Sequence, residues 1–118
     1  MGAYLKGIPE TAIQLAVSTG DILYTCPLGV HARVDDLSFK NTTTTDRTVT
    51  LYLVRAGGAI GVTFEIWNAV SIPKTATAPK GVICYEIIGK ILNPGDFIQA
   101  FASAATAITP MGSVVEFN

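Results

Sequence analysis

The chain has 118 residues, the size of one ordinary domain, and its eight Lys and Arg against nine Asp and Glu give a formal net charge of −1. Charged residues make up 14% of the chain and hydrophobic residues 49%, and the basic residues are scattered singly. This balance excludes the concentrated basic surface that nucleic-acid binding needs, and it indicates that other protein covers part of the surface, the alternative being a monomer whose surface is rich in Thr, Ser and Ala.

The first third of the chain contains three predicted strands. Residues 11–17 alternate small or polar side chains with Ile, Leu and Val, which predicts a strand followed by a turn at 18–21. Residues 22–26 predict a second strand that ends at a Pro-Leu-Gly turn. Residues 32–40 predict a third, and its alternation slips at Asp35-Asp36, which is typical of a β-bulge.

The middle of the chain begins with an Asn/Thr loop at 41–46 and continues into a predicted strand at 48–55. That strand alternates cleanly, so we expect one face in a core and one face outside. The outward residues would be Thr48, Thr50 and Tyr52, and the inward residues Val49, Leu51 and Leu53. Residues 62–67 predict another strand, and residues 70–80, with two prolines, predict an extended loop.

The last third predicts a strand at 82–88 and a β-turn at 93–96, where Pro and Gly take the central turn positions. From Phe97 to Val115 the chain carries no charge, which is nearly the length of a membrane span. Pro110 and Gly112 would break such a helix. We therefore expect no membrane span but two strands, 97–102 and 106–117, with a bend or a sheet edge at Pro110 and Gly112.

These elements predict an all-β fold of about eight short strands, arranged as a two-sheet antiparallel sandwich of jelly-roll or immunoglobulin-like topology. We expect a single domain over residues 1–118, in which residues 1–14 serve either as part of the sandwich or as an extended N-terminal arm. The N-terminus lacks the charged start and apolar run of a secretory signal. The expected aromatic core residues are Phe39, Phe64, Trp67, Phe97 and Phe101.

The sequence predicts no catalytic, cofactor-binding or metal residues. Its only histidine, His31, belongs to no known Cys–His signature and stands alone as a possible metal ligand, and Cys26 and Cys84 lie apart in apolar segments. We expect two separate buried thiols, with a disulfide as the alternative. Asp35 and Asp36 would point to opposite faces of a strand, and the glycines at 57–61 lack a phosphate-loop spacing.

Several segments, in this order, carry a resemblance to a known family. They are Leu23-Tyr-Thr-Cys-Pro-Leu-Gly, Thr48-Val-Thr-Leu-Tyr-Leu, Ile72-Pro, Ile91-Leu-Asn-Pro-Gly-Asp-Phe-Ile-Gln-Ala, Ala102-Ser-Ala-Ala and Gly112-Ser-Val-Val-Glu. Together they span about Asp21 to Glu116, and the chain resembles small β-sandwich virion structural proteins of tailed bacteriophages. Cys26 departs from the valine usual in that pattern.

The resemblance implies a non-enzymatic structural protein of the virion, assembled in the host cytoplasm. We expect a capsid decoration (cement) protein that forms a homo-oligomer and binds the phage major capsid protein or another virion protein, with no cofactor, nucleic acid or membrane partner. A tail, baseplate or fibre component is the alternative. A further alternative is a carbohydrate- or host-surface-binding module that would use exposed tyrosines: Tyr4, Tyr24, Tyr52 and Tyr85.

Overall fold

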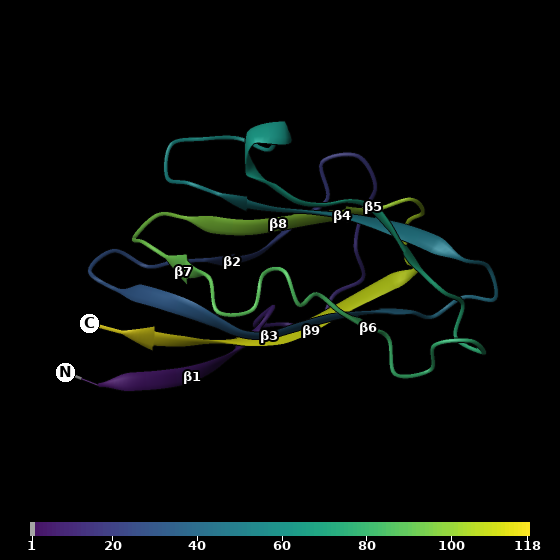
Figure 1. Ribbon diagram of the computed structural model, residues 1–118, viewed down its shortest axis with the longest axis horizontal. Helices are drawn as coiled ribbons and strands as arrows, with labels where there is room; N and C mark the ends of the chain where they lie inside the picture. Colours follow the sequence, from purple (N-terminus) through teal and green to yellow (C-terminus); the bar gives the residue numbers. More distant parts are fainter. Residues whose placement is uncertain (1) are drawn as a thin grey trace.

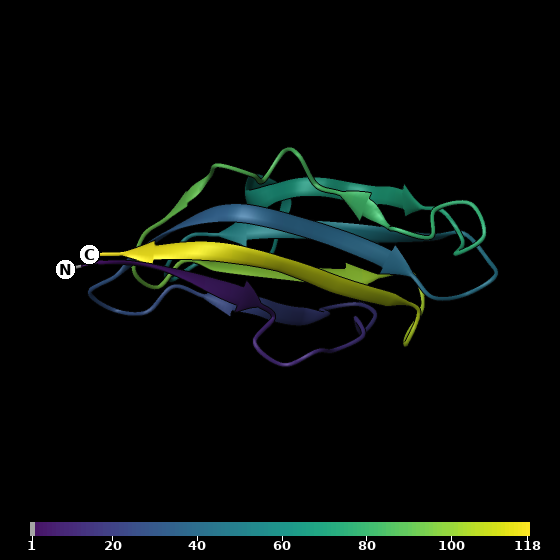
Figure 2. The same ribbon diagram turned by 90° about the horizontal axis from the view of Figure 1, so that it is seen from below.

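The computed structural model describes residues 2–118, which form two antiparallel β-sheets packed face to face (Figures 1 and 2). This confirms the predicted two-sheet sandwich. Within these residues the structure has nine strands and one short 3-10 helix. The strands are β1 (Ala3–Ile8), β2 (Asp21–Thr25), β3 (His31–Asn41), β4 (Arg47–Val54), β5 (Glu65–Ile72), β6 (Val82–Ile83), β7 (Ile91–Leu92), β8 (Phe97–Ala102) and β9 (Ile108–Phe117), and the 3-10 helix is η1 (Val62–Phe64).

The strand order distinguishes between the two predicted topologies. Sheet A has the order β1-β9-β3-β6, with β7 also paired to β3, and sheet B has the order β2-β8-β4-β5. The pairs β1–β9, β2–β8, β3–β6 and β4–β5 are nested, as in one long hairpin wrapped around a barrel axis. This nesting, with strands alternating between the two sheets, is the jelly-roll topology and differs from the immunoglobulin order.

The core lies between the sheets and is filled by the inward residues of β3, β4, β8 and β9. Phe39 of sheet A and Trp67 of sheet B meet across it, with ring centroids 5.6 Å apart. These two aromatic residues are buried as predicted, whereas Phe64, Phe97 and Phe101 are only half-buried and do not belong to the core. The three half-buried rings lie at the ends or on the outer side of sheet B.

The predicted bulge at Asp35-Asp36 is confirmed, because the β3–β9 register shifts between Val34 and Asp36. The bulge also explains Gly112 on the neighbouring strand. A Cβ atom at Gly112 would lie 2.2 Å from the Asp36 carbonyl oxygen, so only glycine fits beside the bulged backbone. β9 is an interior strand, but β1 ends opposite Gly112. Within residues 2–118, β3 is therefore the only strand that pairs with the segment around Pro110.

The predicted outward face of β4 is wrong for two residues. Thr50 and Tyr52 are buried, although Val49, Leu51 and Leu53 do face the core. β4 is an interior strand of sheet B, so its outer side is covered from both neighbours. The Tyr52 ring lies 6.3 Å from the Phe101 ring on β8, and the Thr50 hydroxyl accepts a hydrogen bond from the Ala69 amide on β5.

Four other predicted segments are wrong in whole or in part. Residues 11–17 form a loop that runs past the end of β9, with buried Leu15 donating its amide to the Ile108 carbonyl at 2.9 Å. Residues 62–64 form η1, and β5 extends to residue 72 inside the predicted loop 70–80. Of the predicted strand 82–88, only residues 82–83 pair with β3, because the bulge in β3 interrupts that edge. The following turns instead insert Ile87 into the core.

The N-terminal segment and the uncharged C-terminal segment both form strands. Residues 3–8, which belong to the segment expected as part of the sandwich or as an arm, pair with β9 of the same chain. Figure 1 shows β1 beside β9 at the outer edge of sheet A. Residues 97–102 and 108–117 are β8 and β9, joined by a turn, and among the described residues no helix is long and apolar enough to cross a membrane.

Candidate interaction surface

The polar and reactive side chains that the sequence offers for chemistry do not converge on one site. His31 is exposed at the start of β3, with its ring centroid 6.0 Å from that of Phe117. Asp35 and Asp36 are both exposed at the bulge, and Gly58 closes a turn by donating its amide to the Arg55 carbonyl. Within residues 2–118, no group of three or more His, Cys, Asp or Glu residues could hold a metal ion.

The two cysteine thiols are free and buried, as predicted. Burial raises the pKa of the Cys84 thiol to about 11, and burial also raises the pKa of Cys26. Both thiols therefore stay protonated near neutral pH, in the state that is a poor nucleophile. Beside Cys84, the Trp67 indole donates a hydrogen bond of 2.8 Å to Glu86, which lowers the pKa of that carboxyl group.

Asp96 forms the most connected charged site in the described residues, at the turn between β7 and β8. Its carboxylate accepts hydrogen bonds from Arg55 at 2.7 Å, from the Asn93 amide at 2.8 Å and from the Ala56 amide at 2.9 Å. Burial favours the neutral acid, but these donors outweigh it and lower the pKa of Asp96. The site joins two loops at one end of the sandwich and is structural.

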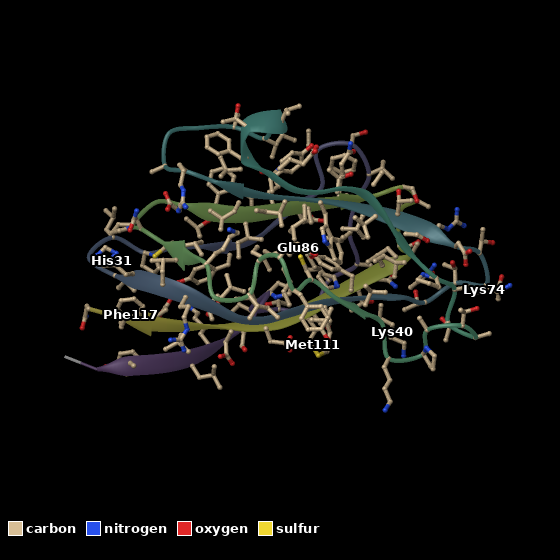
Figure 3. The ribbon with its side chains drawn as sticks, viewed as in Figure 1. His31, Lys40, Lys74, Glu86, Met111 and Phe117 are labelled. Atoms are coloured by element: carbon tan, nitrogen blue, oxygen red, sulfur yellow. The ribbon has the colours of Figure 1, made fainter. Side chains whose placement is uncertain are left out.

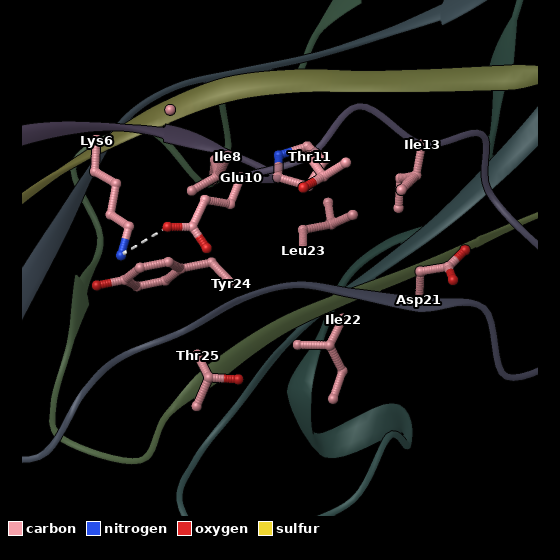
Figure 4. A pocket seen from close by; sticks show the side chains of 12 residues that line it. Lys6, Ile8, Glu10, Thr11, Ile13, Asp21, Ile22, Leu23, Tyr24 and Thr25 are labelled. Carbon is pink, nitrogen blue, oxygen red and sulfur yellow. Dashed lines mark ion pairs between the residues drawn. The ribbon is translucent and has the colours of Figure 1, made fainter.

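A cleft of about 410 Å³ opens between β1 and β2, where the two sheets separate at one flank (Figure 4). Lys6 reaches into it and lies 3.7 Å from Glu10 and 3.9 Å from Glu116. The Tyr24 hydroxyl donates a hydrogen bond to the same Glu116 oxygen. Burial and that hydrogen bond raise the pKa of Tyr24, so the phenol stays protonated. Lys6, Glu10 and Glu116 are thus already paired with one another, and Asp21, which also lines the cleft, accepts a hydrogen bond from the Ala16 amide.

The outer face of sheet A presents a different surface, with six apolar side chains that point away from the core. They alternate with inward residues, as a strand period of two requires. Leu5 and Met111 are the most exposed, at 70% and 67%, and Ile91 and Ile83 are exposed at 42% and 40%. The six residues are Leu5 on β1, Ile83 on β6, Ile91 on β7, and Met111, Val115 and Phe117 on β9.

Strand register places these residues in rows across the sheet. Leu5 lies opposite Val115, Val115 opposite Arg33, and Arg33 opposite Ile91, so one row crosses β1, β9, β3 and β7. Figure 3 labels His31 and Phe117 at one end of this face and Met111 farther along β9. The row is apolar except for Arg33, which is exposed and makes no salt bridge within residues 2–118.

On the strands of sheet B within residues 2–118, Ile22 is the only exposed large apolar side chain, and Phe97 and Phe101 of β8 are half-buried on the outer face. The corresponding row on that face runs from Ile22 through Gln99 and Tyr52 to Glu65. Only Ile22 in that row is an exposed apolar side chain, because Tyr52 is buried. The amide of Gln99 is occupied by the Thr19 carbonyl. The outer face of sheet A is therefore the candidate interaction surface.

Sequence reasoning did not locate this surface. It instead grouped four tyrosines as exposed, but Tyr24 and Tyr52 are buried and only Tyr4 and Tyr85 are exposed. The available signal was the alternation of Met, Ser, Val and Phe at positions 111–117. Assigning that row to solvent required knowing that β9 lies between β1 and β3.

Comparisons of this chain with protein-family models, with curated proteins and with solved structures find no match.

Proposed function

We propose that this chain is a non-enzymatic structural protein of a bacteriophage virion, and specifically a capsid decoration protein that binds and stabilises the head. The observation that carries the proposal is the outer face of sheet A, where Leu5, Met111, Ile83 and Ile91 are exposed. Three charged side chains of β3 share that face, namely Arg33, Asp36 and Lys40, and none of them forms a salt bridge within residues 2–118. Exposed apolar rows with few charges are typical of surfaces that other protein covers.

The binding mechanism follows from the composition of that face. Each square ångström of apolar surface removed from water contributes roughly 25 cal/mol, so burying the row would favour docking. Arg33 would act as a polar anchor, because it lies between Val115 and Ile91 in its row and arginine is enriched among the residues that carry most of the binding energy. Many symmetric copies on one particle would add avidity to a weak single contact.

The jelly roll supports the proposal only in a general way. This fold occurs in viral capsid proteins and also in lectins and cupins, so the fold does not determine the function. The low charge content, 14% of residues, is the second supporting observation, because an isolated monomer usually carries about 25%. A tail, baseplate or fibre component would use the same surface. The location of the protein in the particle distinguishes this alternative from a decoration protein.

The test is co-sedimentation of the purified protein with isolated phage heads and, separately, with isolated tails. We expect saturable binding to heads at a fixed ratio to the capsid protein. Met111→Lys should weaken this binding by about tenfold or more, because it places a charge in the apolar contact. Ile22→Lys, on the outer face of sheet B, is the matched control and should bind as the wild type does.

Two other outcomes would change the assignment. Binding to tails alone would make the chain a tail or baseplate component. Binding to neither particle fraction, or equal loss of head binding in both variants, would contradict the role given to the outer face of sheet A.

A further inference from the structure

The free edge of β1 is the starting point. β1 pairs with β9 on one side only, and its register over residues 3–8 is regular, with no bulge. The backbone groups along its other side have no strand partner in the described residues. Such an edge is a template for another strand, and proteins usually block it with bulges, short strands, proline or charge.

The other edges of the two sheets are blocked in these ways. β2 has a register shift between Ile22 and Tyr24, and β5 has two irregularities in its pairing with β4. β5 also contains Ala69 at a positive φ of 49°. The remaining edge of sheet A is made of β6 and β7, which are two residues long each. Among the strands of residues 2–118, β1 alone offers a regular and unblocked edge.

β1 also has no unpaired charge that would protect its free edge. Its outward positions are Ala3, Leu5 and Gly7, none of which is charged. Lys6 points inward, where Glu10 and Glu116 neutralise it. An inward lysine protects an edge when it is unpaired and would be buried by a partner strand, whereas this lysine already has two carboxylate partners.

The sequence of β1 is suited to pairing with a second copy of itself. A two-fold axis normal to the sheet keeps outward residues opposite outward residues. The axis must then pass beside one residue, which pairs with its own copy, and the central residues of β1 are Tyr4, Leu5 and Lys6. An axis at Lys6 would place two like charges directly opposite, which is destabilising. An axis at Tyr4 would pair only residues 2–6, whereas an axis at Leu5 pairs residues 2–8.

The Leu5 register also makes favourable cross-strand pairs. It sets Leu5 against Leu5 of the second copy and Lys6 beside the Tyr4 ring of the second copy. Tyr4 is 64% exposed, so its ring is available for a cation–π contact. The apolar row Leu5–Val115 would then continue across the axis into the same row of the second copy.

We propose that β1 pairs antiparallel with β1 of a second copy, about a two-fold axis at Leu5, so that two copies of sheet A form one continuous sheet. The dimer is isologous, because both copies use the same edge. The interaction does not depend on the capsid role: it concerns the free protein, and it would present the outer faces of both sheets A on one side.

The experiment is sedimentation velocity of the wild type and two variants over a range of concentrations. The wild type should sediment as a dimer that dissociates on dilution. Leu5→Lys places like charges on the axis and should raise the dimer dissociation constant by about tenfold or more. Met111→Lys, an equally exposed site on β9 beyond the end of β1, is the matched control and should remain dimeric.

A cross-linking measurement tests the register itself. Leu5→Cys would place two thiols opposite each other on the axis, and a short bifunctional maleimide should link them into a covalent dimer. Met111→Cys should not cross-link, and the native thiols do not interfere because both are buried.

A wild type that is monomeric at every concentration would overturn the proposal, as would a dimer unaffected by Leu5→Lys. Efficient cross-linking through position 111 in place of position 5 would overturn the register. The capsid role is tested separately, because Met111→Lys should lose head binding while it keeps the dimer.

Discussion

Replacing Asp96 by asparagine tests whether its carboxylate holds one end of the sandwich together. The side chain is buried and accepts three hydrogen bonds, from Arg55, Asn93 and Ala56. An asparagine can keep its oxygen toward the Ala56 amide. Its NH₂ group then faces the Arg55 guanidinium and the Asn93 amide, which both donate hydrogen bonds to Oδ2 in the wild type. Two charge-assisted bonds are lost, each contributing about 1.5 kcal/mol, so Asp96→Asn should lower the free energy of unfolding by about 3 kcal/mol.

This loss is large compared with the free energy of unfolding of an ordinary domain, about 5–15 kcal/mol. Urea unfolding, followed by the fluorescence of the single tryptophan, measures it. Asp46→Asn is the matched control, because exposed Asp46 accepts one bond through one oxygen, from the Lys74 amide. It should change stability by less than about 0.5 kcal/mol. Arg55→Ala should cost about 1 kcal/mol, because Arg55 is half-exposed.

The pH dependence gives a second check on the same carboxylate. The folded pKa of Asp96 lies below its ordinary value, so the stabilisation is fully present above the unfolded pKa of about 3.9. It is lost as the pH falls through the folded pKa. The stability difference between wild type and Asp96→Asn should therefore shrink as the pH falls below about 4. Equal stability of the Asp96→Asn and Asp46→Asn variants at neutral pH would refute the reasoning.

Two further predictions concern the bulge and the thiols. Gly112→Ala should lower the free energy of unfolding by about 2–3 kcal/mol, because its Cβ would collide with the Asp36 carbonyl, whereas Gly61→Ala, with open space around it, should be near neutral in the same urea titration. Cys26 and Cys84 should resist a thiol reagent at pH 8 in the native protein and react fully in denaturant, since both are buried with raised pKa values. Rapid native-state reaction of either thiol would contradict its burial.

The parts of the fold that the sequence predicts well are those where local pattern and tertiary position agree. β3 and β4 alternate over most of their length, and the turn at 93–96 has the residues that its geometry needs. The bulge at Asp35-Asp36 was visible because it shifts the alternation itself. Each of these features depends on neighbours along the chain.

The wrong predictions share a different cause. Residues 11–17 and 82–88 have strand-like composition, but a strand also needs a free partner edge. The first segment passes the end of β9, and the second meets β3 where its bulge interrupts pairing. The sequence does not distinguish a sandwich strand from an extended arm within residues 1–14 for the same reason, because the partner of β1, β9, lies about a hundred residues away in the chain.

The candidate surface depends on such long-range pairing even more strongly. Leu5 and Val115 become neighbours only when β1 joins β9, and Arg33 enters the same row only when β3 pairs on the other side. No local pattern marks these residues as one surface. The jelly roll creates the surface by bringing the two ends of the chain together, and the same pairing leaves β1 with its regular free edge. The free edge of β1 and the apolar row that begins at Leu5 therefore lie next to each other. A second copy paired at β1 would extend the outer face of sheet A and leave that face exposed.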